Sequence, residues 1–232
     1  MRYLGLLGGM SWESTAEYYR LINRHVAERL GGLHSAPLLL HSVDFAEVAA
    51  MQRSGDWDGA GALLAGAARG LEGAGARALV LCTNTMHHVA PAIERAVGVP
   101  LLHIVDPTGE AMRAAGVRRA ALLGTRYTMT LPFWRDRLRD RFGVALLVPG
   151  EADRDVVHGV IYDELVRGRI EPASRAAYAA IIARLADAGA EAVVLGCTEI
   201  TLLISPADSP IPVFDTTGLH AAAASAWCVG DG

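Results

Sequence analysis

The chain has 232 residues, of which 52% are hydrophobic and 20% charged, and its formal net charge is −4. That length allows one large domain or two small ones, because domains commonly run to about 100–150 residues. The weak negative charge gives no basic surface suited to nucleic acid, and no apolar stretch approaches the roughly 20 residues of a membrane helix.

Cysteine and lysine usage narrows the chemistry further. Three cysteines, an odd number, argue against a disulfide framework and predict a reducing, cytoplasmic location. The opening stretch Met1–Gly9 is too short and too soon interrupted by glycine for a signal peptide. All 21 basic residues are arginine. Without lysine, the chain can form neither the Schiff base of a pyridoxal-phosphate enzyme nor the phosphate grip of a P-loop.

The first half of the chain alternates strand-like and helix-like segments. An apolar run at Tyr3–Leu7 ends in a glycine turn, and Ser11 is a suitable cap for a helix predicted over Trp12–Leu30. Such alternation predicts a parallel sheet covered by helices on both faces. The remaining segments are a strand at Leu38–His41, a polar loop at Ser42–Asp58, a helix at Gly59–Ala74, a strand at Ala78–Leu81, a helix at Asn84–Val97, a strand at Leu101–Val105 and a helix opened by Asp106–Gly109.

The second half repeats this order. Cys197 and Gly124 lie 115 residues after Cys82 and Gly9, and Pro210–Gly218 echoes Val99–Gly109. The other matching segments are a strand at Arg119–Gly124, a strand at Val144–Val148, a helical region at Asp153–Ala188 and a strand at Ala192–Gly196. We predict an internal duplication that gives two pseudosymmetric parallel-sheet α/β domains with the active site in the cleft between them. The first would comprise residues 1–105 with 216–232, and the second residues 106–215.

Two cysteines occupy matching positions in the two halves. Cys82 and Cys197 each follow a buried strand and each precede a threonine. Open α/β sheets bind ligands beyond the carboxyl ends of their strands, so both thiols fall at ligand-binding edges. One free cysteine usually just packs in a core, but two at matching strand ends favour a shared function. Cys228, in an alanine-rich terminal segment, has no counterpart and is expected in the core.

Two thiols on opposite faces of one carbon could invert that carbon. The reference pKa of a thiol is about 8.5, which a helix N-terminus can lower, and both cysteines precede a predicted helix start. A thiolate would remove a proton from one face and a thiol would return one to the other, which in principle needs no cofactor. The carbanion would need hydrogen-bond donors near the substrate carboxylate. The candidate donors are Thr83, Asn84, Thr85, Thr125, Thr128 and Thr198.

Four motifs resemble those of the aspartate/glutamate racemase family, the cofactor-independent amino-acid racemases, and the likeness covers nearly the whole chain. They are Gly8–Thr15, Cys82–His87, Ile161–Leu165 and Leu195–Ile200. The resemblance implies two pseudosymmetric α/β domains, a catalytic cysteine from each, and commonly a homodimer. Some members have threonine at one cysteine position and lose ability toward one enantiomer. This sequence has both cysteines, which favours reversible racemisation.

The resemblance also implies a substrate site. The amino-acid head would contact Met10, Thr83, Asn84, Thr85 and Thr198, and a loop with Gln52 and Arg53 would lie near the substrate side chain. Arg53 is either a bidentate clamp on a distal carboxylate or a solvated loop charge. Weaker candidates of the same kind are Arg167 and Arg169.

Three further residues have two interpretations each. Glu199 could orient or deprotonate a neighbouring group, or only cap its helix. His87 and His88 are close enough to Cys82 to tune the thiol, although such histidines are more often packed or at the surface. No Cys/His spacing matches a zinc site, so no metal is predicted.

The sequence therefore predicts a cytoplasmic, cofactor-free racemase that acts on a small amino acid, aspartate or glutamate or a broader set. Neither nucleic acid nor a membrane is expected as a partner. One alternative is a single-thiol isomerase or decarboxylase of a small dicarboxylate. Another is a non-catalytic protein that binds a small acid. The second cysteine disfavours both alternatives, because neither requires it.

Overall fold

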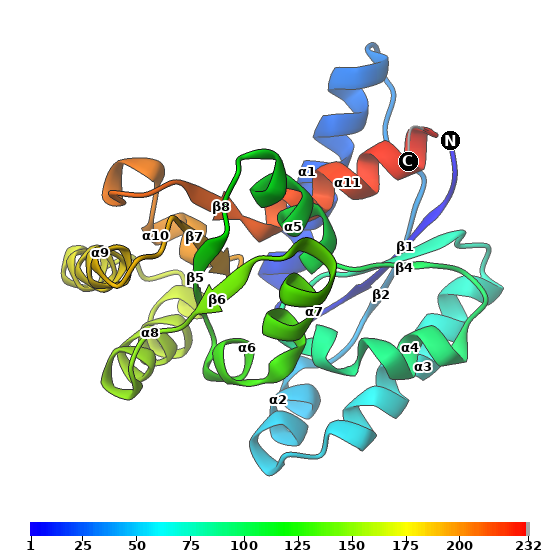
Figure 1. Ribbon diagram of the computed structural model, residues 1–232. Helices are drawn as coiled ribbons and strands as arrows, with labels where there is room; N and C mark the ends of the chain where they lie inside the picture. The colour runs from blue at the N-terminus through cyan, green and yellow to red at the C-terminus, as the bar shows by residue number, and fades with distance from the viewer. Residues whose placement is uncertain (231–232) are drawn as a thin grey trace. The chain divides into compact units, whose positions relative to one another are not determined.

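The computed structural model describes residues 1–230, which form two compact units. The first contains Met1–Ile104 and the residues from His220 onward, and the second contains Val105–Leu219. Each unit holds a four-stranded parallel sheet, in the order β2-β1-β3-β4 in the first and β6-β5-β7-β8 in the second (Figure 1). The two sheets thus share one topology. The predicted fold class, two parallel-sheet α/β domains, is confirmed.

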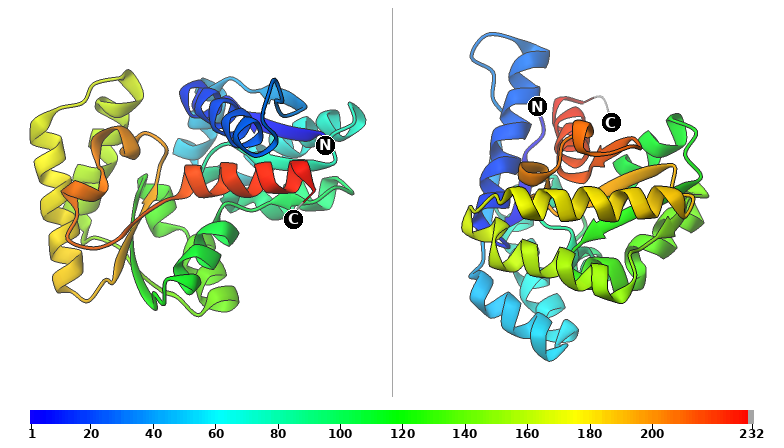
Figure 2. Two further views of the ribbon diagram at one scale, coloured as in Figure 1. Left: turned by 90° about the horizontal axis from the view of Figure 1, so that it is seen from above. Right: turned by 90° about the vertical axis from the view of Figure 1, so that its left-hand side faces the viewer.

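In the first unit, β1 (Leu4–Gly8) lies between β2 (Leu38–Ser42) and β3 (Ala78–Leu81), and β4 (Leu101–Leu102) pairs with β3. Its helices are α1 (Trp12–Leu30), α2 (Phe45–Ser54), α3 (Trp57–Gly73), the 3-10 helix η1 (Thr85–Val89), α4 (Ala90–Ala96) and α11 (Thr216–Val229), whose first residues belong to the second unit. Helix α11 runs beside α1, as both figures show (Figures 1 and 2).

Alternate residues of the first sheet face two separate cores. Leu4 and Leu6 of β1 pack in a cluster with Tyr18 and Ile22 of α1 and with residues of α11, whereas Leu7 belongs to the cluster under α3 and α4. Successive side chains of a strand point to opposite faces of the sheet, so neighbouring residues of β1 enter different cores. Both faces of the sheet must therefore be apolar. Cys82, directly after β3, lies on the α1 and α11 side.

The second unit repeats the arrangement. Strand β5 (Arg119–Gly124) lies between β6 (Ala145–Leu147) and β7 (Ala192–Gly196), and β8 (Val213–Asp215) pairs with β7. Its helices are α5 (Val105–Ala114), α6 (Arg126–Thr130), α7 (Pro132–Phe142), α8 (Glu151–Asp163), η2 (Leu165–Arg167), α9 (Pro172–Asp187), α10 (Ile200–Leu203) and η3 (Pro206–Asp208).

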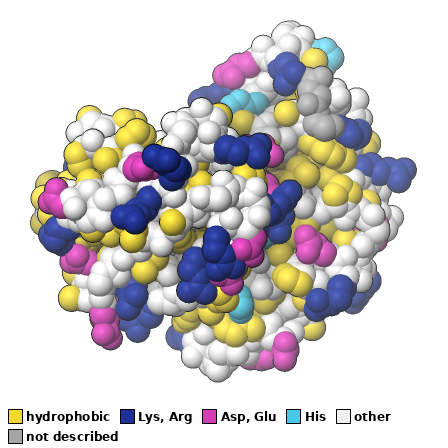
Figure 3. Space-filling model, viewed as in Figure 1, with side chains coloured by type: hydrophobic (Ala, Val, Ile, Leu, Met, Phe, Trp, Pro, Cys, Tyr) yellow, Lys and Arg dark blue, Asp and Glu magenta, His cyan; other side chains and the backbone are white. Residues whose placement is uncertain are grey.

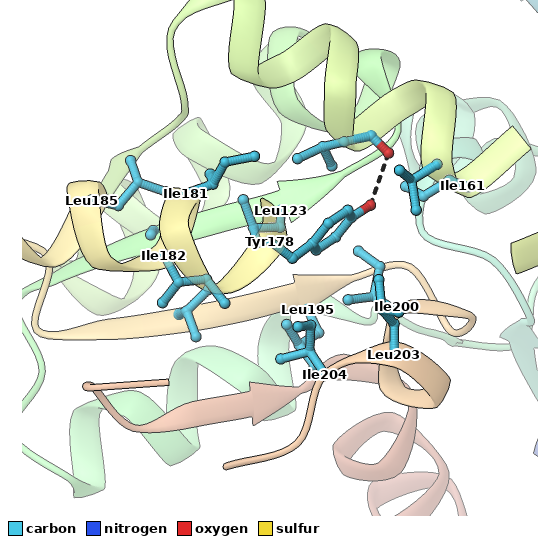
Figure 4. Packing of buried hydrophobic residues seen from close by; sticks show 14 of the residues in the cluster. Leu123, Ile161, Tyr178, Ile181, Ile182, Leu185, Leu195, Ile200, Leu203 and Ile204 are labelled. Atoms are coloured by element: carbon cyan, nitrogen blue, oxygen red, sulfur yellow. Dashed lines mark hydrogen bonds between the residues drawn. The ribbon is translucent and has the colours of Figure 1, made fainter. Parts of the chain in front are cut away.

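Tyr178 anchors the core of the second unit where α8 and α9 cover one face of the sheet. Its ring is fully buried among residues such as Leu123 and Leu195, and its hydroxyl donates to the carbonyl of Val157 at 2.8 Å (Figure 4). The two helices run side by side in Figure 2. A buried tyrosine needs such an acceptor, because an unmade hydrogen bond in the core is costly.

The loop predicted over Ser42–Asp58 is wrong, because most of it forms α2. The Asp44 side chain caps this helix by accepting from the Ala46 N–H at 2.9 Å, and Val48, Ala49 and Gln52 bury one face. Those positions have the i, i+1, i+4 spacing of a helical stripe. The charged and polar residues between them hid that stripe in the sequence.

Three other segments are shorter than predicted. The strand at Leu101–Val105 is limited to β4, since α5 begins at Val105. The helix at Asn84–Val97 is divided into η1 and α4, because Pro91 near the start of α4 has no N–H to continue a single helix. The helical region from Asp153 to Ala188 is divided into α8 and α9 by η2 and Gly168.

The surface carries charges of both signs. On the face shown in Figure 3, arginine and carboxylate side chains are interspersed rather than separated into fields of one sign. Ion pairs such as Arg137–Asp106 and Arg184–Asp153 join side chains of opposite sign. Within residues 1–230, no helix combines the length and apolar character that crossing a membrane requires.

Candidate active site

Cys82 lies at the carboxyl edge of the first sheet. It follows β3 directly, and its N–H donates to the carbonyl of Leu7 at 2.9 Å, so it is still paired with β1. The neighbouring strand ends in the Gly8–Gly9 turn. Cys82 is therefore next to the first glycine turn, at the edge where parallel sheets bind ligands. Its side chain is fully buried.

The glycine turn is packed against the start of α1. The Gly9 N–H donates to Thr15 Oγ1 at 2.8 Å, and a Cβ on Gly8 would lie 2.4 Å from the Thr15 methyl. Gly9 has a φ of +93°, which side chains rarely tolerate. Ser11 caps α1 as predicted, accepting from the Ser14 N–H. Met10, a predicted substrate contact, is 5% exposed within this turn.

The next predicted residues form one short turn, Cys82–Thr85, which we call the Cys82 turn. The Thr83 N–H donates to the carbonyl of Leu81 at 2.8 Å, and Asn84 stands at the N-cap of η1. Thr83, Asn84 and Thr85 are each less than a tenth exposed. The structure thus gathers three of the predicted hydrogen-bonding residues beside Cys82.

Helix α2 brings Gln52 to this region. The Gln52 side-chain amide donates to Sδ of Met86 at 3.0 Å, which joins α2 to η1. Gln52 is buried, whereas Arg53, in the last turn of the same helix, is exposed. Both predicted residues therefore lie on a helix rather than a loop, and Gln52 contacts the segment that follows Cys82.

The second unit places its predicted residues at the matching edge. Gly124 of β5 pairs with Gly196 of β7, and Cys197 follows directly. Thr125 caps α6 by accepting from the Thr128 N–H at 3.2 Å, and Thr128 is fully buried beneath the two glycines. Thr198 Oγ1 lies 3.1 Å from Thr217 Oγ1.

Glu199 contacts the second thiol directly. Sγ of Cys197 donates to Oε2 of Glu199 at 2.9 Å, and the glutamate is only 7% exposed. Of the two interpretations of Glu199, the contact with a neighbouring reactive group fits this geometry, because no side-chain cap bond to α10 is present. The residue at the same offset from Cys82 is Asn84. The two thiols thus have different polar neighbours.

Burial outweighs the lowering that a helix N-terminus can give, although the backbone N–H groups of Thr198 and Glu199 do lower the pKa of Cys197. Burial raises the pKa of Cys82. Burial, and then the nearby Glu199 carboxylate, raise the pKa of Cys197 well above the ordinary value. The helices that follow are short, with five residues in η1 and four in α10, so loss of solvation dominates. Burial therefore favours the neutral thiol form of both groups.

The His88 side chain packs against Trp57 of α3. Its ring makes an edge contact with Trp57, with ring centroids 4.8 Å apart, and burial lowers its pKa. Both residues line a surface hollow of about 560 Å³ beside Arg69 and Arg95, and Cys82 does not line it. His87, in contrast, is 1% exposed and hydrogen bonded to the Cys82 turn.

The sequence and fold match one family of known proteins. Residues 7–224 match the sequence model of the Asp/Glu/hydantoin racemase family. The chain belongs to this family. The family predicted from the four motifs is therefore confirmed, and it assigns the protein to the racemases, a class of isomerases acting on small amino-acid substrates.

Solved structures support the same assignment. A candidate Asp/Glu racemase from Yersinia pestis is 50% identical, with a TM-score of 0.93 over 99% of this chain and 100% of that chain. An aspartate racemase homologue from Pyrococcus horikoshii OT3 is 31% identical, with a TM-score of 0.86 over 99% of this chain and 100% of that one. A glutamate racemase from Francisella tularensis, solved with D-glutamate, shares the fold at 11% identity and a TM-score of 0.63, over 98% and 81% of the two chains.

Proposed function

We propose that this protein interconverts the enantiomers of aspartate or glutamate without a cofactor, using Cys82 and Cys197 as its two catalytic groups. One observation carries the proposal: the thiols occupy the same topological position in the two units. Each follows the third strand of its unit, β3 or β7, beside a strand that ends in a glycine turn. One substrate would thus receive one thiol from each unit.

The proposed reaction transfers one proton off the substrate Cα and another onto it. A thiolate takes the α-proton, and the electron pair of the broken C–H bond delocalises into the substrate carboxylate. The thiol of the other cysteine then donates its proton to the opposite face of the carbon. Donors from the Cys82 turn and from Thr198 would stabilise the negative charge that develops on the carboxylate.

One cysteine must first lose its proton, because burial raises the pKa of both thiols. For Cys197 the acceptor is in place, since Glu199 Oε2 already receives its hydrogen bond. Moving that proton to Glu199 gives a thiolate beside a neutral carboxylic acid, so the pair keeps its net charge. This avoids burying an additional charge.

Two other observations support the proposal that the substrate is an acidic amino acid. Similar proteins are described as Asp/Glu or aspartate racemases, and Arg53 lies exposed on α2, whose Gln52 contacts η1. A guanidinium can bind a second carboxylate through two parallel hydrogen bonds. We further propose that the protein is a cytoplasmic homodimer, and light scattering of the purified protein would test its mass.

Racemisation in deuterium oxide tests the proposal. Chiral chromatography with mass detection would follow L- and D-forms of aspartate, glutamate, uncharged amino acids and a substituted hydantoin. We expect inversion with deuterium at Cα for an acidic amino acid, and loss of inversion in both Cys82→Ser and Cys197→Ser. Cys228→Ser is the matched control, because Cys228 is buried against α1 and donates to the Arg2 carbonyl.

Two results would argue against the proposal. A wild-type protein that exchanges the α-proton of no amino acid in this panel would contradict the proposed racemisation. A protein in which only one cysteine is essential would use a single-thiol reaction, and small dicarboxylates would then be the substrates to assay.

A further inference from the structure

Three histidines and a tyrosine form a buried group in the first unit, which we call the histidine cluster: His87, His103, His220 and Tyr18. None of the four is more than 5% exposed. The ring centroid of His87 lies 4.5 Å from that of His103 and 5.8 Å from that of His220, which in turn lies 5.5 Å from the Tyr18 ring. The proposed proton transfers use none of these residues.

The hydrogen bonds of His87 define its protonation. Its Nδ1 lies 2.7 Å from the carbonyl oxygen of Thr83, which can only accept, so Nδ1 carries the hydrogen. Its Nε2 accepts from the N–H of Ile104 at 3.2 Å, so Nε2 carries the lone pair. His87 is therefore a neutral imidazole in the Nδ1–H tautomer, held between two backbone groups.

Those two backbone groups belong to different parts of the first unit. Thr83 is in the Cys82 turn, and Ile104 is the last residue before the chain passes into the second unit. His220, the first residue after the chain returns, donates from Nε2 to the carbonyl of Leu102 at 2.7 Å. The cluster thus holds the backbone on both sides of His103, next to both points where the chain changes units.

The bond to Thr83 also determines which way a neighbouring N–H points. In a trans peptide the carbonyl and the following N–H point in opposite directions. Because His87 draws the Thr83 carbonyl toward the cluster, the N–H of Asn84 is directed away from it. This N–H belongs to the turn in which substrate-binding residues were predicted.

We propose that His87 is a positioning residue for racemisation. Its Nδ1–H bond orients the Thr83–Asn84 peptide. Its Nε2 bond links that peptide to Ile104, the last residue before the chain enters the second unit. The proposal rests on the proposed racemase function. In this role His87 transfers no proton; it acts through the backbone of the Cys82 turn.

Two isosteric substitutions separate the two bonds. In His87→Asn the side-chain amide nitrogen can occupy the place of Nδ1 and keep the donor to Thr83. In His87→Gln the amide group can occupy the place of Nε2 and keep a partner for Ile104, but the donor to Thr83 is lost. We expect His87→Asn to keep kcat/KM within about threefold of wild type and His87→Gln to lose roughly tenfold or more.

A purely structural role would not separate the two variants in this way, since each loses one hydrogen bond. Thermal unfolding of both variants would check that their stabilities are comparable. His220→Asn is the matched control: it removes the donor to Leu102 but leaves His87 and Thr83 bonded. We expect it to lower stability while keeping kcat/KM within about threefold.

Nitrogen NMR of the wild-type histidines gives a second test, which needs neither activity nor a variant. We expect His87 to show a protonated Nδ1 and an unprotonated Nε2. The opposite tautomer, or equal activity of His87→Asn and His87→Gln, would overturn the inference even if the wild type is an active racemase. A wild type that racemises nothing would instead refute the proposed function on which the inference rests.

Discussion

The Cys197 thiol donates a hydrogen bond to the Glu199 carboxylate at 2.9 Å, whereas Asn84 stands at the same offset from Cys82. The duplicated strands thus end in two chemically different pairs. A carboxylate can take a proton from its thiol, and an amide cannot. This difference predicts that Glu199 serves the deprotonation of Cys197.

Glu199→Gln is therefore expected to lower kcat by about 10²–10⁴-fold, the usual contribution of a general base, while the amide oxygen can still accept from the thiol. Racemisation has an equilibrium constant of one, so kcat/KM must fall equally in both directions. The values of kcat and of KM can each differ between the two directions, provided that their ratio stays the same. Glu199→Asp keeps a carboxylate and should recover part of the rate. A kcat for Glu199→Gln within twofold of wild type would show that Glu199 is not the acceptor.

Arg53→Gln tests the interpretation of Arg53 as a clamp on a distal carboxylate. A charge-assisted hydrogen bond contributes about 1.5–3 kcal/mol, which corresponds to roughly a 10- to 150-fold loss of kcat/KM for aspartate or glutamate. The corresponding uncharged amide substrate should lose far less. Arg69→Gln, an exposed arginine on α3, is the matched control. Equal losses for charged and uncharged substrates would support the solvated-charge interpretation.

The raised thiol pKa values predict a loss of stability at alkaline pH. Burial raises the pKa of Cys82, so the folded protein keeps a proton that the unfolded chain has lost. The resulting stability is fully present below about pH 8.5, the ordinary thiol pKa, and is lost as the pH rises toward the folded value. We expect the free energy of unfolding to fall by about 1.4 kcal/mol per pH unit for each such thiol.

Urea unfolding between pH 7.5 and pH 10, in wild type and Cys82→Ala, measures that dependence. In Cys82→Ala the free energy of unfolding should fall less steeply with pH, by the contribution of one thiol. This difference in slope does not depend on the absolute stability of the variant. Tyrosine titration affects both proteins alike and cancels in the difference. Identical slopes would mean that Cys82 ionises in the folded protein as it does in the unfolded chain.

Gly8→Ala tests the packing of the first glycine turn on α1. Its Cβ would lie 2.4 Å from the methyl and 2.7 Å from the hydroxyl of Thr15, which accepts from the Gly9 N–H. Overpacking of this kind costs about 1–3 kcal/mol. Gly70→Ala is the control, because its added Cβ would meet no atom within 4 Å beyond the nearby backbone of its own helix, and alanine favours α3 by about 0.5–1 kcal/mol. Chemical denaturation should therefore show opposite signs for the two changes.

The positions of the two cysteines could be predicted because they depend on local patterns. A buried strand, a glycine turn and a duplicated spacing are all readable along the chain, and α1 begins and ends where Ser11 and the apolar spacing indicate. The family followed from the same motifs. Helix α2 was missed because its buried face is short and partly polar, with Gln52 among its buried residues.

The rest depends on contacts between residues far apart in the sequence. His220 bonds to Tyr18 across 202 positions, and no local signal in either segment indicates that pairing. The thiol pKa values likewise depend on how completely the fold excludes water, which the residues next to each cysteine do not determine. The hydrogen bond of Gln52 to Met86 requires α2, which was not predicted.

The discontinuous first unit has a consequence for synthesis on the ribosome. Helix α11 completes the core against α1 through the bond of Ser225 to Ile22 and through backbone pairing of Arg2 with Cys228. The α11 residues of these pairs emerge only after the whole of the second unit, which is one uninterrupted stretch of chain. The second unit can therefore fold during translation, whereas the first exposes the apolar face of α1 until α11 has left the exit tunnel. Nascent chains stalled before His220 should accordingly bind chaperones through their N-terminal segment, which contains α1.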